Sequence, residues 1–101
     1  MSERVEVRRI GHLAYGATVH DGNDTTHHKV TMSPAFLDDL LVPDVDTDRV
    51  AEETIRYLLD RETGDAIPHE VDLDHLSNHN DAFVGELRAR LTGGRLRGAD
   101  E

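Results

Sequence analysis

Hydrophobic and polar residues alternate along the first third of the chain, and this two-residue period predicts β-strands. A turn should form at Asp21–Asp24, because glycine and asparagine favour the positive φ that a tight hairpin connection needs. Three apolar sets define the expected strands: Val5 and Val7 with Ile10 as a further candidate, the odd positions from Leu13 to Val19, and His28, Val30 and Met32.

The rest of the chain shows helical periodicity. Ser33 and Pro34 are typical of the N-cap and first position of a short helix that should end at Leu41. A longer helix is expected from Asp48 to Glu62, with Asp46, Thr47 or Asp48 as its cap. Its buried stripe would be Val50, Ala51, Thr54, Ile55, Leu58 and Leu59.

A second helical region follows an interruption at Thr63–Asp65. The segment 66–68 should be extended, because a residue before proline disfavours helical geometry. Apolar spacing from Asp72 to about Leu91 predicts helix again, and Ser77–Asn80 should divide it into two shorter helices. Its apolar stripe is Leu73, Leu76, Phe83, Leu87 and Leu91.

Together these elements predict an α+β fold, in which an N-terminal two- or three-stranded antiparallel sheet is packed by three or four C-terminal helices. Residues 1–92 should form a single domain, since about 100 residues make one core. Residues 93–101 are rich in glycine and charge and are expected to be a flexible tail. The long helix should pack on Val30 and Met32 and against Phe83 and Leu87.

Charge is the most informative feature of the composition. The 101 residues include 21 acidic and 11 basic side chains, a net charge of −10, and Lys29 is the only lysine. This balance favours adaptation to concentrated salt, in which carboxylate repulsion is screened. A high-GC genome is the alternative explanation for the missing lysines, although it accounts less well for the negative excess. The same charge disfavours binding to a phosphate backbone.

The absence of cysteine excludes disulfides, zinc–thiolate sites and thiol nucleophiles. The longest apolar runs, such as Leu40–Val42, are too short to span a bilayer, and the first residues are charged rather than apolar. We therefore expect a cytoplasmic protein that does not enter the membrane.

Two patterns suggest metal ligands, and neither is complete. His75 and His79 would share one helix face at ligand spacing, with His69 or Asp72 as a third ligand, but the glutamate of the zinc-protease motif is replaced by Leu76. The acidic run Asp44, Asp46 and Asp48 resembles the start of a calcium loop. That loop requires glycine and glutamate at positions where this chain has Arg49 and Ile55. We assign no metal site, and we expect the acidic run to cap a helix.

We also assign no catalytic or cofactor-binding residue. His27 and His28 should point to opposite faces of their strand, so they cannot chelate one ion as neighbours. Ser33 lacks a histidine or acid partner at a recognisable spacing, and helix capping explains it. The glycines form no phosphate-binding pattern. The sequence therefore predicts a protein that is not an enzyme and has no cofactor.

From Thr26 to Glu62 the order strand, short helix, loop and longer helix resembles ribbon-helix-helix regulators. The resemblance implies a dimer whose paired strands enter the DNA major groove. The outward face of the strand would then be Thr25, His27, Lys29 and Thr31, where that family usually has basic or amide side chains.

The chain also resembles a group of small uncharacterised prokaryotic proteins. The shared features are a VTVS-like strand end at Val30–Ser33, an RFLLERE-like helix end at Arg56–Glu62, and a following segment at Val71–Leu73. The resemblance carries no activity with it.

The prediction from sequence is therefore a non-catalytic interaction or regulatory module with an unknown protein partner. A DNA-binding regulator and a metal-binding accessory protein are the alternatives, and a homodimer is one option for its assembly.

Overall fold

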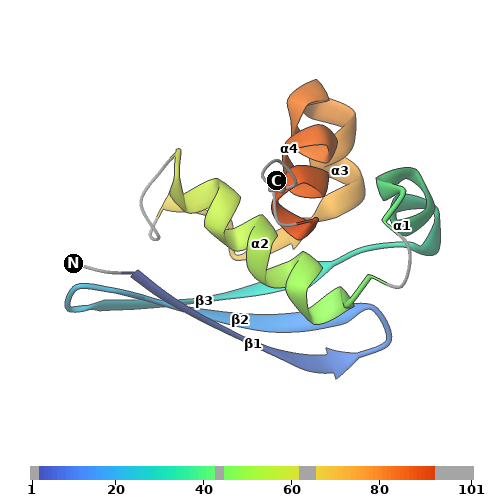
Figure 1. Ribbon diagram of the computed structural model, residues 1–101. Helices are drawn as coiled ribbons and strands as arrows, with labels where there is room; N and C mark the ends of the chain where they lie inside the picture. Colours follow the sequence, from blue (N-terminus) through green and yellow to red (C-terminus); the bar gives the residue numbers. More distant parts are fainter. Residues whose placement is uncertain (1–2, 43–44, 62–65, 93–101) are drawn as a thin grey trace.

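The computed structural model describes residues 3–42, 45–61 and 66–92. Four strands form one mixed sheet in the order β1-β2-β3-β4, and four helices cover one of its faces (Figure 1). The strands are β1 (Glu3–Gly11), β2 (Ala14–Asp21), β3 (Asp24–Thr31) and β4 (Glu70–Asp72). The helices are α1 (Pro34–Leu40), α2 (Thr47–Leu59), α3 (Leu73–His79) and α4 (Asp81–Leu91). The α+β class predicted from the sequence is confirmed.

The first three strands form the antiparallel meander that the alternation predicts. β2 pairs with β1 on one side and with β3 on the other, with Val19 opposite Val5 and Thr26. The β2–β3 turn places Gly22 at φ 63, a backbone conformation that glycine adopts without steric cost. Tyr15, Ala17 and Val19 are buried, and so the odd positions of β2 face the core as expected.

The sheet differs from the prediction by its fourth strand. β4 pairs in parallel with β3, with Val71 opposite Val30, so the sheet is mixed rather than purely antiparallel. Three residues are too few to show a two-residue period, and Val71 alone carries the apolar signal. The strand is held by backbone pairing with β3 and by burial of Val71.

Side-chain caps set the helix boundaries, as the sequence suggested. Ser33 Oγ accepts a hydrogen bond from the Phe36 N–H at 3.1 Å, with Pro34 in the first turn of α1. Asp46 caps α2. Asn80 caps α4 and separates it from α3, which confirms the division of the last helical region. The predicted stop at Thr63–Asp65 and the tail at 93–101 lie outside the described residues.

The core lies between the sheet and the helix layer. Val50, Ile55 and Leu58 of α2 are buried there, together with Val30, Met32, Phe83 and Leu87. The main neighbours of α2 are β1, β2 and α4 rather than β3. Leu59, expected at full burial, is only partly buried. No described helix is long and apolar enough to cross a membrane.

Candidate functional site: the uncovered face of the sheet

All the helices lie on one side of the sheet, which leaves its other side uncovered (Figure 1). We call this side the open face. Because side chains alternate along a strand, its residues follow from the pairing registers. They are Arg4, Glu6, Arg8 and Ile10 of β1, Ala14, Gly16, Thr18 and His20 of β2, Thr25, His27, Lys29 and Thr31 of β3, and Glu70 and Asp72 of β4.

Ile10, which the sequence offered as a candidate for the core side of β1 beside Val5 and Val7, lies on the open face instead. It is 50% exposed, and its Cγ2 would lie 3.5 Å from a Cβ built on Gly16. Ile10 lies five positions after Val5, an odd number, so the alternation itself places it on the side opposite the core. The register irregularity between Arg9 and Gly11 does not return it to the buried side.

Gly16 forms the floor of a shallow hollow in the open face. The hollow has a volume of about 580 Å³, and its lining includes Glu6, Arg8, Thr18 and His27 around the glycine. Arg8 and Lys29 are the residues directly opposite Gly16 on the two neighbouring strands. Strand spacing places their Cα atoms roughly 10 Å apart. A glycine between two cationic residues leaves room for a partner's acidic group.

The basic side chains of this acidic chain differ in how they are neutralised. On the helix layer, Arg49 and Arg56 each contact a glutamate one turn away, at 3.5 and 2.9 Å. Arg88 donates to the Leu40 carbonyl at 2.7 Å. Within the described part of the chain, Arg8 and Lys29 have no carboxylate within 4 Å and no side-chain hydrogen bond. Among the described residues, the open face thus holds two cations, Arg8 and Lys29, that remain available for a partner.

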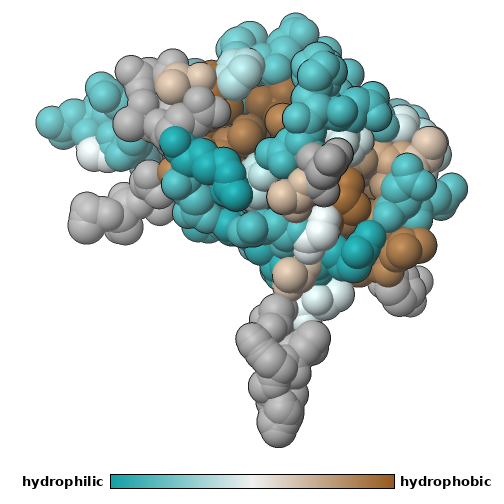
Figure 2. Space-filling model, turned by 90° about the horizontal axis from the view of Figure 1, so that it is seen from above, coloured by the Kyte–Doolittle hydropathy of each residue, from teal (hydrophilic) through white to brown (hydrophobic). Residues whose placement is uncertain are grey.

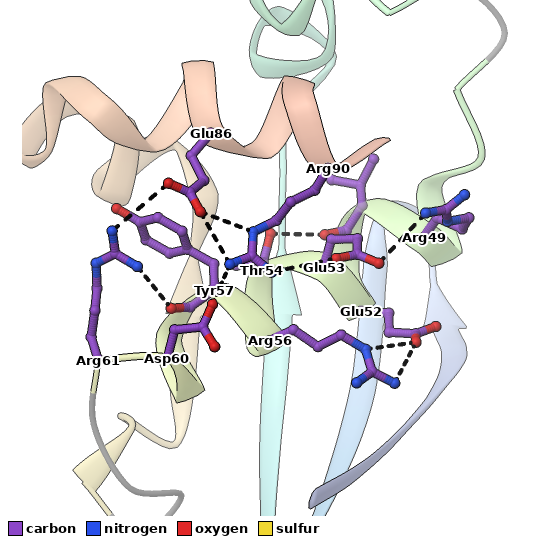
Figure 3. Close-up of polar contacts among 11 residues, drawn as sticks. Arg49, Glu52, Glu53, Thr54, Arg56, Tyr57, Asp60, Arg61, Glu86 and Arg90 are labelled. Carbon is purple, nitrogen blue, oxygen red and sulfur yellow. Dashed lines mark hydrogen bonds and ion pairs between the residues drawn. The ribbon is translucent and has the colours of Figure 1, made fainter. Parts of the chain in front are cut away.

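On the helix layer, by contrast, the arginines drawn in Figure 3 are paired with carboxylates of the same layer. Arg90 of α4 contacts Glu53 of α2 and Asp60, the C-cap of α2, as well as Glu86 one turn away. Burial acts to lower the pKa of the Arg90 guanidinium, but the hydrogen bonds and charges of Asp60 and Glu86 raise the pKa overall. Arg90 therefore stays charged and joins the two helices.

From the helix side the surface is mostly hydrophilic, with hydrophobic side chains visible between the helices (Figure 2). All four aromatic residues of the chain are buried: Tyr15, Phe36, Tyr57 and Phe83 are at most 2% exposed. Neither side of the molecule therefore offers a tyrosine or phenylalanine ring on which a nucleic-acid base could stack.

The two histidines of the open face make only long polar contacts. Thr18 Oγ1 lies 3.4 Å from His27 Nδ1, and Thr25 Oγ1 lies 3.4 Å from His20 Nδ1. Contacts of this length in solvent are weak hydrogen bonds and do little to activate a hydroxyl as a nucleophile. These pairs suit recognition of a polar partner better than acid–base chemistry.

His28 points to the buried side, as its alternation with His27 predicts. Its Nδ1 donates to the Pro68 carbonyl at 2.8 Å, and its Nε2 lies 2.9 Å from Thr26 Oγ1. A carbonyl can only accept, so Nδ1 carries the proton and, in the neutral ring, Nε2 accepts from the threonine. Nδ1 thus attaches β3 to the segment before β4, and Nε2 forms a bond within β3.

The candidate metal ligands His75 and His79 do share one face of α3, with ring centroids 4.1 Å apart. His79 Nδ1 donates to the His75 carbonyl at 3.0 Å. Among the described residues there is no group of three or more side chains that could hold a metal ion. Asp72, considered as a third ligand, instead caps α3 through the Asp74 N–H.

Two further candidates have structural roles. Asp46 caps α2, while Asp44 lies outside the described residues. Ser33 has an acidic partner that its spacing did not reveal, because its hydroxyl donates to Asp74 Oδ1 at 2.8 Å across 41 positions. This bond joins the start of α1 to α3, and no histidine completes a catalytic set.

The strand geometry required by the ribbon-helix-helix resemblance is absent from β3. Lys29 is opposite Gly16 of β2 and Glu70 of β4, so both edges of this strand are paired within the chain. Around Lys29, β3 therefore has no edge left for a symmetry mate.

Comparison of the chain with protein-family models, curated proteins and solved structures gave no match.

Proposed function

We propose that this protein is a non-catalytic interaction module that binds an acidic segment of a protein partner on the open face of its sheet. The observation that carries the proposal is the row Arg8, Gly16 and Lys29. In a chain of net charge −10, two cations without a described carboxylate partner flank a glycine-floored hollow. Carboxylates of a partner would be attracted to this row and repelled by most of the remaining surface.

The neighbouring side chains support a polar rather than an apolar contact. Thr18 and His27 line the hollow and offer hydrogen-bond donors and acceptors, and Ile10 supplies an apolar rim. A protein partner fits this mixture better than a nucleic acid. The tyrosine and phenylalanine rings are buried, so a base has none of them to stack on, and β3 is paired on both edges around Lys29.

The proposal can be tested by capturing partners from lysate at native salt with three forms of the protein. The first is the wild type, the second Lys29→Glu on the open face, and the third Arg56→Glu on the helix layer as a charge-matched control. We expect wild type and Arg56→Glu to retain the same partner and Lys29→Glu to lose it. Retention by all three forms, or loss with the control alone, would contradict binding on the open face.

A further inference from the structure

The outer edge of β1 is a second surface, distinct from the open face. β1 is the end strand of the sheet and bonds only to β2 among the described elements. No described element lies beside its outer edge (Figure 1). It is nine residues long and contains no proline, whereas the opposite edge strand, β4, has three residues. A long open edge presents unpaired backbone N–H and C=O groups to another strand.

The charges along β1 are self-complementary in one antiparallel register. Directly opposed residues face the same side of a sheet. A twofold axis perpendicular to the sheet must therefore lie midway between the two copies of one residue. With the axis at Val7, Glu6 faces Arg8 of the second copy, and Arg8 faces Glu6. This register places two opposite-charge pairs on the open side and pairs the whole strand from 3 to 11.

The neighbouring registers either oppose like charges or pair fewer residues. An axis at Glu6 opposes the two Glu6 side chains and places Arg4 against Arg8, and an axis at Arg8 opposes two arginines. An axis at Val5 does oppose Arg4 and Glu6, but it pairs only residues 3–7. Because like charges in direct opposition destabilise a strand pair, the Val7 register is favoured both by charge and by ladder length.

The buried side of β1 fits the same register. Val7 is only partly buried in the single chain, and the axis would bring it against its own copy. Val5 would face Arg9, whose aliphatic stem can cover it while the guanidinium stays in solvent. Opposed β-branched residues at the centre of a strand pair add to its stability.

We propose that two copies of this chain associate through β1 in the antiparallel register centred on Val7, forming one continuous eight-stranded sheet. The two open faces would then lie side by side on the same surface. The inference does not rest on the proposed function, because it concerns the edge of the sheet and is measured by mass alone.

Exchanging Glu6 and Arg8 singly and together tests the dimer, and the double exchange leaves the composition unchanged. Sedimentation equilibrium at about 0.15 M salt, where charges are screened beyond about 8 Å, should show a concentration-dependent dimer for the wild type. Glu6→Arg and Arg8→Glu each turn both pairs into repulsions and should weaken the dimer on the order of tenfold. The double variant carrying both changes restores two opposite-charge pairs and should recover the dimer.

Lys29→Glu is the control, because Lys29 lies on the open face but two strands away from the edge; it should leave the dimer constant unchanged. Thermal melts of each variant establish that it is folded. A wild type that stays monomeric at every concentration would overturn the proposal. So would single variants that dimerise like wild type, or a double variant that fails to recover the dimer.

Discussion

The side chain of Asn80 donates a hydrogen bond from Nδ2 to the hydroxyl oxygen of Tyr57 at 2.7 Å. Its Oδ1 accepts from the Ala82 N–H at 3.1 Å and so caps α4. Tyr57 is 1% exposed and packs edge-on against Phe83 with ring centroids 5.0 Å apart. One polar side chain therefore both begins α4 and satisfies the buried phenol of α2.

This double role predicts the stability of two Asn80 variants. Asn80→Ala should lower the free energy of unfolding by about 2–4 kcal/mol, because a cap contributes about 1 kcal/mol and an unsatisfied buried polar group costs about 1–3 kcal/mol. Asn80→Ser keeps a capping oxygen but is too short to reach Tyr57, so it should lose less. Urea unfolding measures both. An Asn80→Ser variant as stable as wild type would show that the bond to Tyr57 contributes nothing, and equal losses for the two variants would show that the cap contributes nothing.

The core of α2 gives a second prediction. Leu58→Ala should lower the free energy of unfolding by about 2–5 kcal/mol, because Leu58 is buried against the sheet and α4. Leu59→Ala should cost clearly less, because Leu59 is only partly buried. Urea midpoints of the two variants compare neighbouring residues of one helix. A larger loss for Leu59 would mean that the buried face of α2 is rotated from its position here.

Sequence periodicity could locate most of the elements because each long element repeats its apolar period several times. The odd positions of β2, the stripe of α2 and the break at Asn80 all follow from local patterns. β4 was missed because three residues hold less than two periods and because its partner, β3, lies about 40 positions earlier. The bond between Ser33 and Asp74 was missed for the same reason of sequence distance.

The candidate site was only half visible from the sequence. Alternation assigned Thr25, His27, Lys29 and Thr31 to one outward face, and the structure places them on the open face. The row that joins Arg8, Gly16 and Lys29 depends on the register of two hairpins, which periodicity alone does not fix. The charge complementarity of β1 is present in the sequence, but its significance depends on β1 being an edge strand.

The variant Gly16→Ala tests whether the glycine is needed for the stability of β2. A Cβ at this position would meet Ile10 Cγ2 at 3.5 Å, an ordinary contact, so alanine fits the strand. Gly16→Ala should raise the free energy of unfolding by roughly 0.5–1 kcal/mol, because glycine loses more backbone entropy on folding. If Gly16→Ala instead destabilises the protein in urea unfolding, the glycine is needed for the strand rather than for the hollow.

The net charge of −10 predicts that the melting temperature rises with potassium chloride between 0.1 and 2 M. Carboxylate repulsion opposes the compact state, and its screening length falls from about 10 Å at 0.1 M to about 3 Å at 1 M. Sucrose at equal osmolality is the control, because it is excluded from protein surfaces without screening charge. A flat or falling melting temperature in the salt series would remove the argument for salt adaptation.

The most direct test of binding on the open face uses the single lysine of the chain. An imidoester photo-crosslinker attached to Lys29 keeps the positive charge and lies beside the hollow. After irradiation in lysate, we expect one partner crosslinked to Lys29, displaced by excess unlabelled wild type but not by unlabelled Lys29→Glu. In Lys29→Arg, only the terminal amine can carry the reagent, and the crosslink should disappear. The account would be contradicted if the partner is still captured by Lys29→Arg or is displaced equally well by Lys29→Glu.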